Sequence, residues 1–209
     1  MKHSKINQAA LSERRYKIIN WGIQVKKIKN HFKKTIAQAN RNGFFENLYI
    51  SEDKINRQVQ LLSGQHPTGE IEKTQDKWEN KSSKLLAESG ACIVISQSSI
   101  GDVAITLYPY SSEGYKRDRP NIIWAVYPSP TDITDKILDY VTKDFFVYIR
   151  VSSTLMQESR IDRLRIRYLE LKGMRYHNKN NIIKLFFSHW SLIALGAIGS
   201  IASIYSLFK

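Results

Sequence analysis

The 209-residue chain has few of the residues that mark a chemical site. It has one cysteine, Cys92, and its five histidines are scattered with no pair at the spacing of metal ligands. A lone cysteine agrees with a reducing compartment, and its β-branched neighbours predict a buried core position. No G-x-x-x-x-G-K, G-x-G-x-x-G or G-x-S-x-G sequence occurs, which removes the common signatures of nucleotide binding and serine hydrolysis. We therefore expect no enzyme, no cofactor and no metal site.

Charge is absent from residues 185–208, which contain no Asp, Glu, Lys or Arg and read LFFSHWSLIALGAIGSIASIYSLF. At about 1.5 Å per helical residue, this segment is long enough to cross a hydrocarbon core of roughly 30 Å. Trp190 and Tyr205 lie near its two ends, where aromatic rings favour the membrane interface. The N-terminus has no apolar core of the signal-peptide kind. We therefore predict a single C-terminal transmembrane helix that anchors the protein by its tail.

The distribution of basic residues predicts the orientation of this anchor. Residues 160–184 contain eight Lys or Arg and two acidic residues, whereas only Lys209 follows the uncharged segment. The positive-inside bias keeps such a basic flank in the cytoplasm. We expect a single-pass protein of the cell inner membrane or another cytoplasm-facing membrane, with the bulk of the chain cytoplasmic.

Small residues gather on one side of the predicted membrane helix. Gly196 and Ser200 form one small-x-x-x-small pair, and Gly199 and Ser203 form a second. Such pairs let helix backbones approach closely where lipid gives no hydrophobic drive for association. The pattern favours a homo-oligomer, although small residues are also common in membrane helices that do not associate. The sequence also leaves open an oligomer in which the polar side chains of the membrane helices line a water-filled lumen.

The beginning of the chain is strongly basic. Residues 1–41 carry eleven basic residues and one acidic residue, a net charge of +10 out of +13 for the whole chain. We predict that residues 1–43 form a basic amphipathic helix, because apolar residues three or four apart make one stripe: Ile18, Trp21, Val25, Ile28, Phe32, Ile36 and Ala39. Its lysines are candidates for contact with anionic lipid or nucleic acid, or they simply keep a packed helix soluble: Lys26, Lys27, Lys33 and Lys34.

The middle of the chain predicts two different kinds of structure. We expect residues 44–90 to form a helical hairpin, with helices over 45–62 and 71–88 joined by a turn over 64–69. We expect residues 91–153 to form a small α+β domain. Short apolar runs separated by turn residues predict its three-stranded antiparallel sheet, with strands over 92–95, 103–108 and 121–127.

A helix should follow the sheet, because Ser129, Pro130 and Asp132 provide a cap, a first-turn proline and a capping-box acid. After a break near 151–154, residues 154–184 predict a basic juxtamembrane helix. Its apolar residues again lie three or four apart: Ile161, Leu164, Tyr168 and Leu171. The expected fold class is therefore α+β, with a helical N-terminal region, a small sheet with flanking helices and a C-terminal membrane anchor.

The loop between the last two predicted strands is a candidate for binding a protein partner or an anionic ligand. It combines aromatic faces with basic side chains, a mixture suited to a nucleotide or other anion: Tyr110, Tyr115, Lys116, Arg117 and Arg119. Exposed hairpin loops are also often polar without binding anything. The alternative prediction is therefore a polar loop with no ligand or partner.

These patterns lead to one preferred function and two rivals. The preferred function is a tail-anchored protein that self-associates and couples a cytoplasmic binding event to the membrane, as in a membrane-perturbing bacterial toxin or antiviral defence effector. The first rival is a passive membrane tether for a nucleic acid or protein complex. The second is an enzyme with an unrecognised site, for which Asp132 and Asp135 are the first residues to test.

Overall fold

The computed structural model describes residues 2–75, 81–112 and 119–177, and this part of the chain is an α+β fold. It contains three α-helices: α1 (Lys2–Arg41), α2 (Asp135–Ser152) and α3 (Arg160–His177). Its strands are β1 (Leu48–Asp53), β2 (Gln58–Ser63), β3 (His66–Gln75), β4 (Lys81–Ser89), β5 (Cys92–Gln97), β6 (Val103–Tyr108), β7 (Ser111–Ser112) and β8 (Ile122–Tyr127). The predicted anchor, residues 185–208, lies outside the described residues, and no helix within them is long and apolar enough to cross a membrane.

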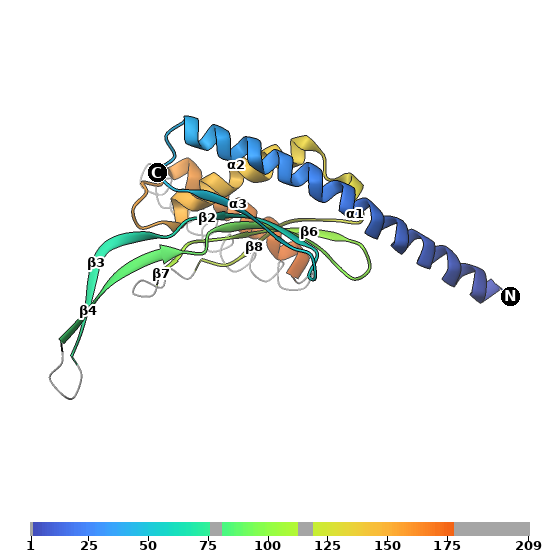
Figure 1. Cartoon of the computed structure of the whole chain (residues 1–209), viewed down its shortest axis with the longest axis horizontal. Coiled ribbons are helices and arrows are strands. Elements are labelled where there is room, and N and C mark those ends of the chain that lie inside the picture. Colours follow the sequence, from blue (N-terminus) through green and yellow to red (C-terminus); the bar gives the residue numbers. More distant parts are fainter. Residues whose placement is uncertain (1, 76–80, 113–118, 178–209) are drawn as a thin grey trace, which may run out of the picture.

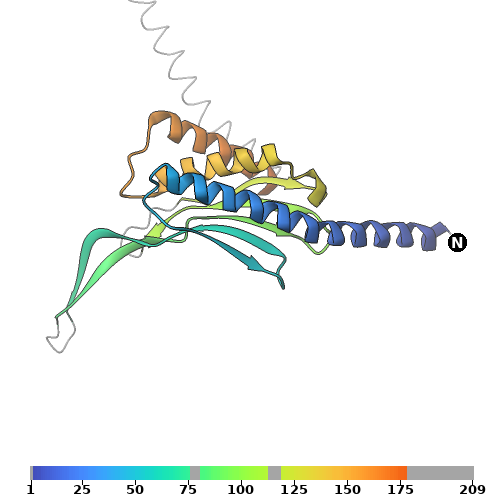
Figure 2. The same ribbon diagram turned by 45° about the horizontal axis from the view of Figure 1, so that its top comes forward.

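The main sheet is antiparallel throughout, with the strand order β1-β2-β5-β6-β8. All three helices lie on one face of this sheet, side by side, with α2 between α1 and α3 (Figures 1 and 2). Alternate residues of the central strands face the helices and are fully buried: Val59, Leu61, Ile93, Ile95, Val103, Ile105 and Leu107. The hydrophobic core therefore forms between one helical layer and one sheet.

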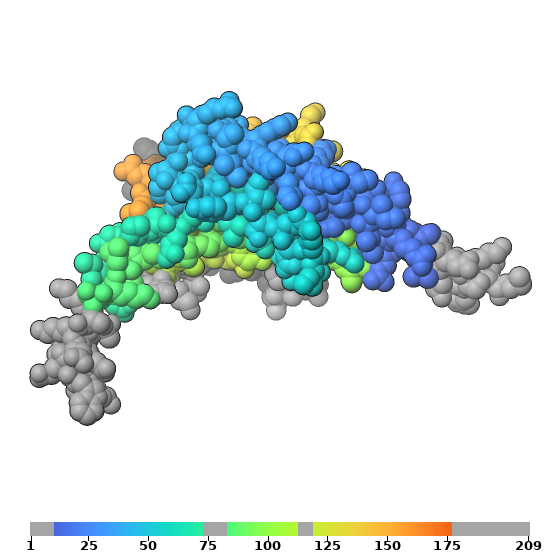
Figure 3. Space-filling view, in the orientation of Figure 1, coloured from blue at the N-terminus to red at the C-terminus, as the bar shows by residue number. Residues whose placement is uncertain are grey.

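The long helix α1 confirms the amphipathic helix predicted over residues 1–43. Its apolar stripe lies against the sheet, and Ile28 and Phe32 at the centre of the stripe are completely buried. Trp21 and Val25 extend the buried face toward the N-terminus. The first turns of α1 continue past the edge of the sheet (Figure 1). The second half of α1 lies across the upper surface of the domain (Figure 3).

The predicted helical hairpin over residues 44–90 is wrong, because this segment forms strands β1 to β4. In β2, burial alternates with a period of two: Val59 and Leu61 are buried, while Gln58 and Gln60 are half-buried. The sequence of this short segment is compatible with a helix or a strand. It forms a strand because it pairs with β5, where Leu61 lies opposite Ile93. The sheet consequently has five strands where the sequence predicted three.

Strands β3 and β4 form an arm that extends away from the main sheet (Figure 1). They pair with each other and with the short strand β7 in a separate three-stranded sheet. Ile71 and Leu85 face each other across the arm, yet they are 58% and 54% exposed. The arm is therefore held by its backbone ladder rather than by a core of its own.

In the later part of the chain the structure agrees more closely with the sequence predictions. The meander β5-β6-β8 is confirmed, and the Ser129–Asp132 capping box is present, although it caps a short 3-10 turn while α2 begins at Asp135 with Thr134 as its cap. Helix α3 continues through Gly173 to His177, although a glycine commonly ends a helix. Gly173 is instead a contact residue, since an added Cβ would lie 3.0 Å from the carbonyl oxygen of Ile123.

Candidate functional site

A groove of about 610 Å³ lies between the C-terminal half of α1 and helix α2. Gly43, with φ at +70°, lets the chain reverse directly after α1 and places Phe44 and Phe45 beside α2. The Phe44 ring meets the Phe146 ring edge-on with 5.2 Å between centroids. Ala39 and Met156 complete an apolar wall. The turn therefore builds an aromatic surface at one end of the groove.

Polar and charged side chains surround this apolar wall. Arg150 lines the groove, but its guanidinium is already held by Asp162 through hydrogen bonds of 3.1 and 3.2 Å. Lys143 also lines it, and we find no ion-pair partner for this exposed side chain among the described residues. Lys143 is therefore a cation that the folded domain leaves available beside the aromatic wall.

The groove continues into a second hollow of about 680 Å³ farther along the two helices. The two hollows share His31, Thr35, Gln38 and Asp139. Lys27 pairs with Asp135 across the second hollow at 3.3 Å, and His31 lies 3.7 Å from Asp139. Burial lowers the pKa of His31 despite these nearby carboxylates, which favours its neutral form at pH 7. The groove is thus apolar at one end and charged at the other.

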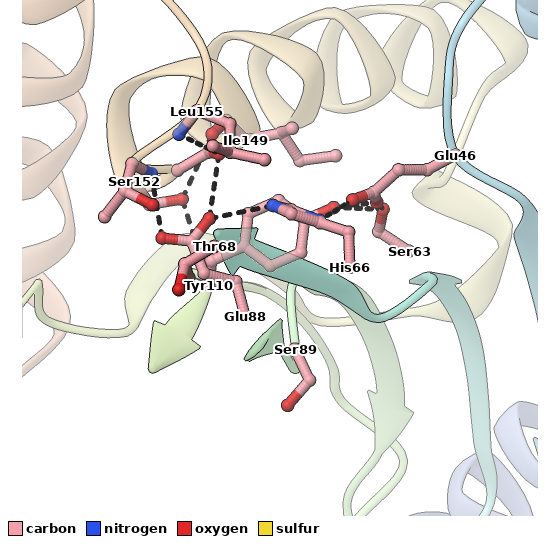
Figure 4. Close-up of polar contacts among 12 residues, drawn as sticks. Glu46, Ser63, His66, Thr68, Glu88, Ser89, Tyr110, Ile149, Ser152 and Leu155 are labelled. Carbon is pink, nitrogen blue, oxygen red and sulfur yellow. Dashed lines mark hydrogen bonds and ion pairs between the residues drawn. The ribbon is translucent and has the colours of Figure 1, made fainter. Parts of the chain in front are cut away.

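A buried cluster of two carboxylates and one imidazole lies between the base of the arm and the end of α2 (Figure 4). His66 lies between Glu46 and Glu88, and all three side chains are less than 10% exposed. The Nε2 atom of His66 is 3.0 Å from Glu88 Oε2, while its Nδ1 atom contacts Glu46 Oε1. Both ring nitrogens of His66 therefore face carboxylate oxygens.

Both carboxylates also accept hydrogen bonds from other groups. Glu46 accepts bonds from Ser63 and from the phenol of Tyr110, whose pKa burial raises above its usual range, so that the phenol keeps its proton. Glu88 accepts bonds from Ser153 Oγ at 2.9 Å and from the Thr154 amide at 2.8 Å. The acid–histidine cluster therefore joins the base of the arm to the end of α2.

The cluster and the groove share a wall. The Phe45 ring, which lines the groove, meets the His66 ring edge-on with 5.5 Å between centroids. Met156, on the same wall, follows Thr154 by two residues. The cluster is closed to solvent and packs directly against the wall of the groove.

The structure places the residues predicted from the sequence in different environments. Tyr110 is 1% exposed, so its ring fills the core and offers no stacking face to a ligand. Arg119 lies 3.8 Å from Glu170. Lys27 and Lys34 line the second hollow, whereas Lys26 and Lys33 are exposed elsewhere on α1. The other predicted site residues lie outside the described residues: Tyr115, Lys116, Arg117, Gly196, Gly199, Ser200 and Ser203.

Sequence reasoning missed both the groove and the cluster. The aromatic pair that follows the Asn42-Gly43 turn was the available signal for the groove. Glu46, His66 and Glu88 are about 20 residues apart, and only the pairing of β3 with β4 brings His66 opposite Glu88. Cys92 agrees with its predicted core position, since it is buried and burial raises its pKa to about 11.

Comparison with known proteins gives no match to a family model, to a curated protein or to a solved structure. Within residues 2–75, 81–112 and 119–177, no group of three or more His, Cys, Asp or Glu side chains is arranged to hold a metal ion. The roles of the groove and the cluster are therefore inferred from their own chemistry.

Proposed function

We propose that the chain is a tail-anchored membrane protein that self-associates and couples a binding event in its cytoplasmic domain to the membrane. The α1–α2 groove is the observation that carries this proposal, because it gives the domain a place to receive a ligand. The uncharged segment 185–208 supplies the anchor. Its Gly196 and Gly199 side supplies the surface for association. The output is membrane perturbation of the toxin or defence-effector type.

The lining of the groove favours a small amphiphilic ligand. An apolar or aromatic body fits against Phe44, Phe45 and Phe146, where burial of apolar surface drives binding. An anionic group on the same ligand fits beside Lys143, the cation without an ion-pair partner among the described residues. Binding would therefore combine apolar contact with one charge-assisted hydrogen bond.

A route from the groove toward the anchor runs through the acid–histidine cluster. A ligand that moves Phe45 or Met156 acts on side chains next to His66 and on the segment that binds Glu88. That segment leads directly into α3, which precedes the anchor in the sequence. A ligand shifts such an arrangement only as far as it binds one conformation better than the other.

Expression of variants in bacteria tests the proposal. Wild type should arrest growth and admit a membrane-impermeant dye when the ligand is present in the cell. Lys143→Ala, which removes the cation, and Thr35→Trp, which fills the groove, should each reduce dye uptake at least tenfold. Lys136→Ala, an exposed lysine of α2 that does not line the groove, is the matched control and should behave as wild type.

Two further variants separate the parts of the proposal. Deletion of residues 185–209 should abolish dye uptake; dye uptake that survives the deletion would contradict the anchor. Gly196→Leu combined with Gly199→Leu should convert detergent cross-linked oligomers to monomers. If both groove variants match wild type while the deletion is inactive, the membrane role stands and the binding role of the groove is wrong.

The tether rival makes a different prediction. Neutralising Lys26, Lys27, Lys33 and Lys34 should weaken nucleic-acid retention, and retention should fall steeply with salt, because phosphate neutralisation releases counterions. Three of these lysines, Lys26, Lys33 and Lys34, are exposed on α1. Retention that depends on neither salt nor these lysines would count against the tether.

A further inference from the structure

Helix α3 presents large apolar side chains to solvent. Ile161, Leu164, Tyr168 and Leu171 are 77%, 65%, 57% and 41% exposed. They are spaced three and four residues apart, so they form one continuous stripe along the helix. We call these four residues the α3 stripe. An exposed apolar stripe of this size marks a surface that contacts something apolar.

The stripe faces outward because the opposite side of α3 is fixed to the domain. Ile166 and Leu169 are buried on that side, and Gly173 is in close contact with β8. Arg165 binds the buried carboxylate of Asp144 through two hydrogen bonds of 2.8 and 2.9 Å. Trp124 donates a third bond to the same carboxylate at 2.7 Å. Turning the stripe inward would break all of these contacts.

Positive charge lies along the stripe. Arg160, Arg163 and Arg167 are exposed and lie one helical turn apart, beside the apolar residues, and Arg163 also forms an exposed pair with Glu158 at 3.4 Å. The two acidic residues of α3 are drawn toward the domain, since Asp162 is held by Arg150 and Glu170 lies near Arg119. The outer side of α3 therefore combines apolar and basic groups, the composition of helices that lie in the surface of an anionic membrane.

The sequence also limits how far α3 can lie from the proposed anchor. Helix α3 ends at His177, and the uncharged segment begins at Leu185. Even a fully extended chain between these residues reaches only roughly 28 Å. An anchored protein therefore holds the α3 stripe at a high local concentration beside the bilayer, which favours contact.

We infer that α3 lies on the anionic bilayer surface, with the α3 stripe among the headgroups and the first acyl carbons and with its arginines on lipid phosphates. This inference extends the proposed function, since the anchor brings α3 to the membrane. Because α3 and α1 lie on opposite sides of α2 (Figure 2), the α1–α2 groove stays on the side of the helical layer away from the docked helix. Docking would thus orient the domain with its groove open.

An environment-sensitive fluorophore on the full chain tests the inference. Leu164→Cys, labelled with nitrobenzoxadiazole, is reconstituted into phosphatidylcholine vesicles with and without phosphatidylglycerol. Cys92 is buried, so labelling is directed to the introduced thiol. The control is Ile55→Cys, which is 93% exposed in the β1–β2 turn, far from α3 in the fold. The expected result is blue-shifted emission at position 164, quenched by shallow spin-labelled lipid, and water-like emission at position 55.

The emission at position 164 also tests the role of the arginines and distinguishes lipid from a second protein copy as the partner of the α3 stripe. Each of Arg160→Gln, Arg163→Gln and Arg167→Gln should lower the membrane-inserted population about fivefold in phosphatidylglycerol vesicles. Water-like emission at position 164 in these vesicles would overturn the inference. A blue shift that depends on protein concentration and appears equally in detergent would also overturn it, because a second protein copy would then cover the stripe.

Alkaline carbonate extraction of the same vesicles separates this inference from the proposed anchor. Protein that resists extraction but shows water-like emission at position 164 keeps the anchor and loses the α3 contact. Protein that is extracted but shows a lipid-dependent blue shift loses the anchor and keeps the α3 contact as a peripheral one.

Discussion

Helices α1 and α3 carry apolar residues at the same spacing but place them in opposite environments. In α1 the stripe faces the sheet, and Ile28 and Phe32 are fully buried. In α3 the stripe faces solvent, and the helix is held instead by Ile166, Leu169 and the Asp144–Arg165 ion pair. The comparison teaches that periodicity of three and four identifies a helix but does not say what its apolar side touches.

The largest expected difference comes from the same substitution in the two helices. Ile28→Ala removes a fully buried side chain from α1 and should lower the free energy of unfolding by about 3 kcal/mol. Ile161→Ala removes a 77% exposed side chain from α3 and should change it by less than about 0.5 kcal/mol. Urea unfolding of the full chain in detergent micelles, followed by tryptophan fluorescence, measures both. Equal losses would mean that α3 buries its stripe within the domain.

A second pair of variants compares the two sides of α3. Arg165→Met leaves the Asp144 carboxylate, which is 6% exposed, without its ion-pair partner and should cost about 2 kcal/mol. This figure is below the usual range for buried pairs because the Arg165 side chain is itself 43% exposed. Arg163→Met breaks an exposed pair with Glu158 and should cost less than about 1 kcal/mol.

The same unfolding measurement in micelles reports both arginine variants. An Arg165→Met protein as stable as Arg163→Met would show that hydrogen bonding from Trp124 alone satisfies Asp144. In that case the Arg165–Asp144 ion pair would not be what holds the inner side of α3 to the domain.

The smallest expected effect is a pH-dependent one at Glu170. Burial raises the pKa of this carboxyl above its usual value of 4.5, more than Arg119 lowers it. Its contribution to stability is thus fully present below the unfolded pKa and is lost as the pH rises through the folded pKa. Glu170→Gln mimics the protonated acid, so it should raise stability at pH 7 by up to about 0.5 kcal/mol and have no effect below the unfolded pKa.

Unfolding curves of Glu170→Gln and wild type at pH 4 and pH 7 measure this difference. Glu158→Gln, which removes the exposed partner of Arg163, is the control and should give no gain at either pH. A loss of stability for Glu170→Gln at pH 7 would mean that the contact with Arg119 outweighs burial.

Much of the fold could be predicted from local pattern, and the exceptions share a cause. The α1 stripe, the β5-β6-β8 meander and the Ser129 cap depend on residues close together in the sequence. Strand β2 could not be assigned in this way, because Val59 and Leu61 suit a helix or a strand and their partners in β5 lie more than 30 residues away. The acid–histidine cluster was missed for the same reason, since it forms only when β3 pairs with β4.

The sequence by itself determined the basic N-terminal helix, the periodic stripes and the uncharged segment at 185–208, because charge and spacing are local properties. Tertiary structure decided which stripe is buried, which carboxylates meet His66 and where a groove opens. It also placed Tyr110, predicted as a ligand contact, inside the core. These features depend on contacts between distant segments, and the free energy of burial that selects them exists only once those segments meet.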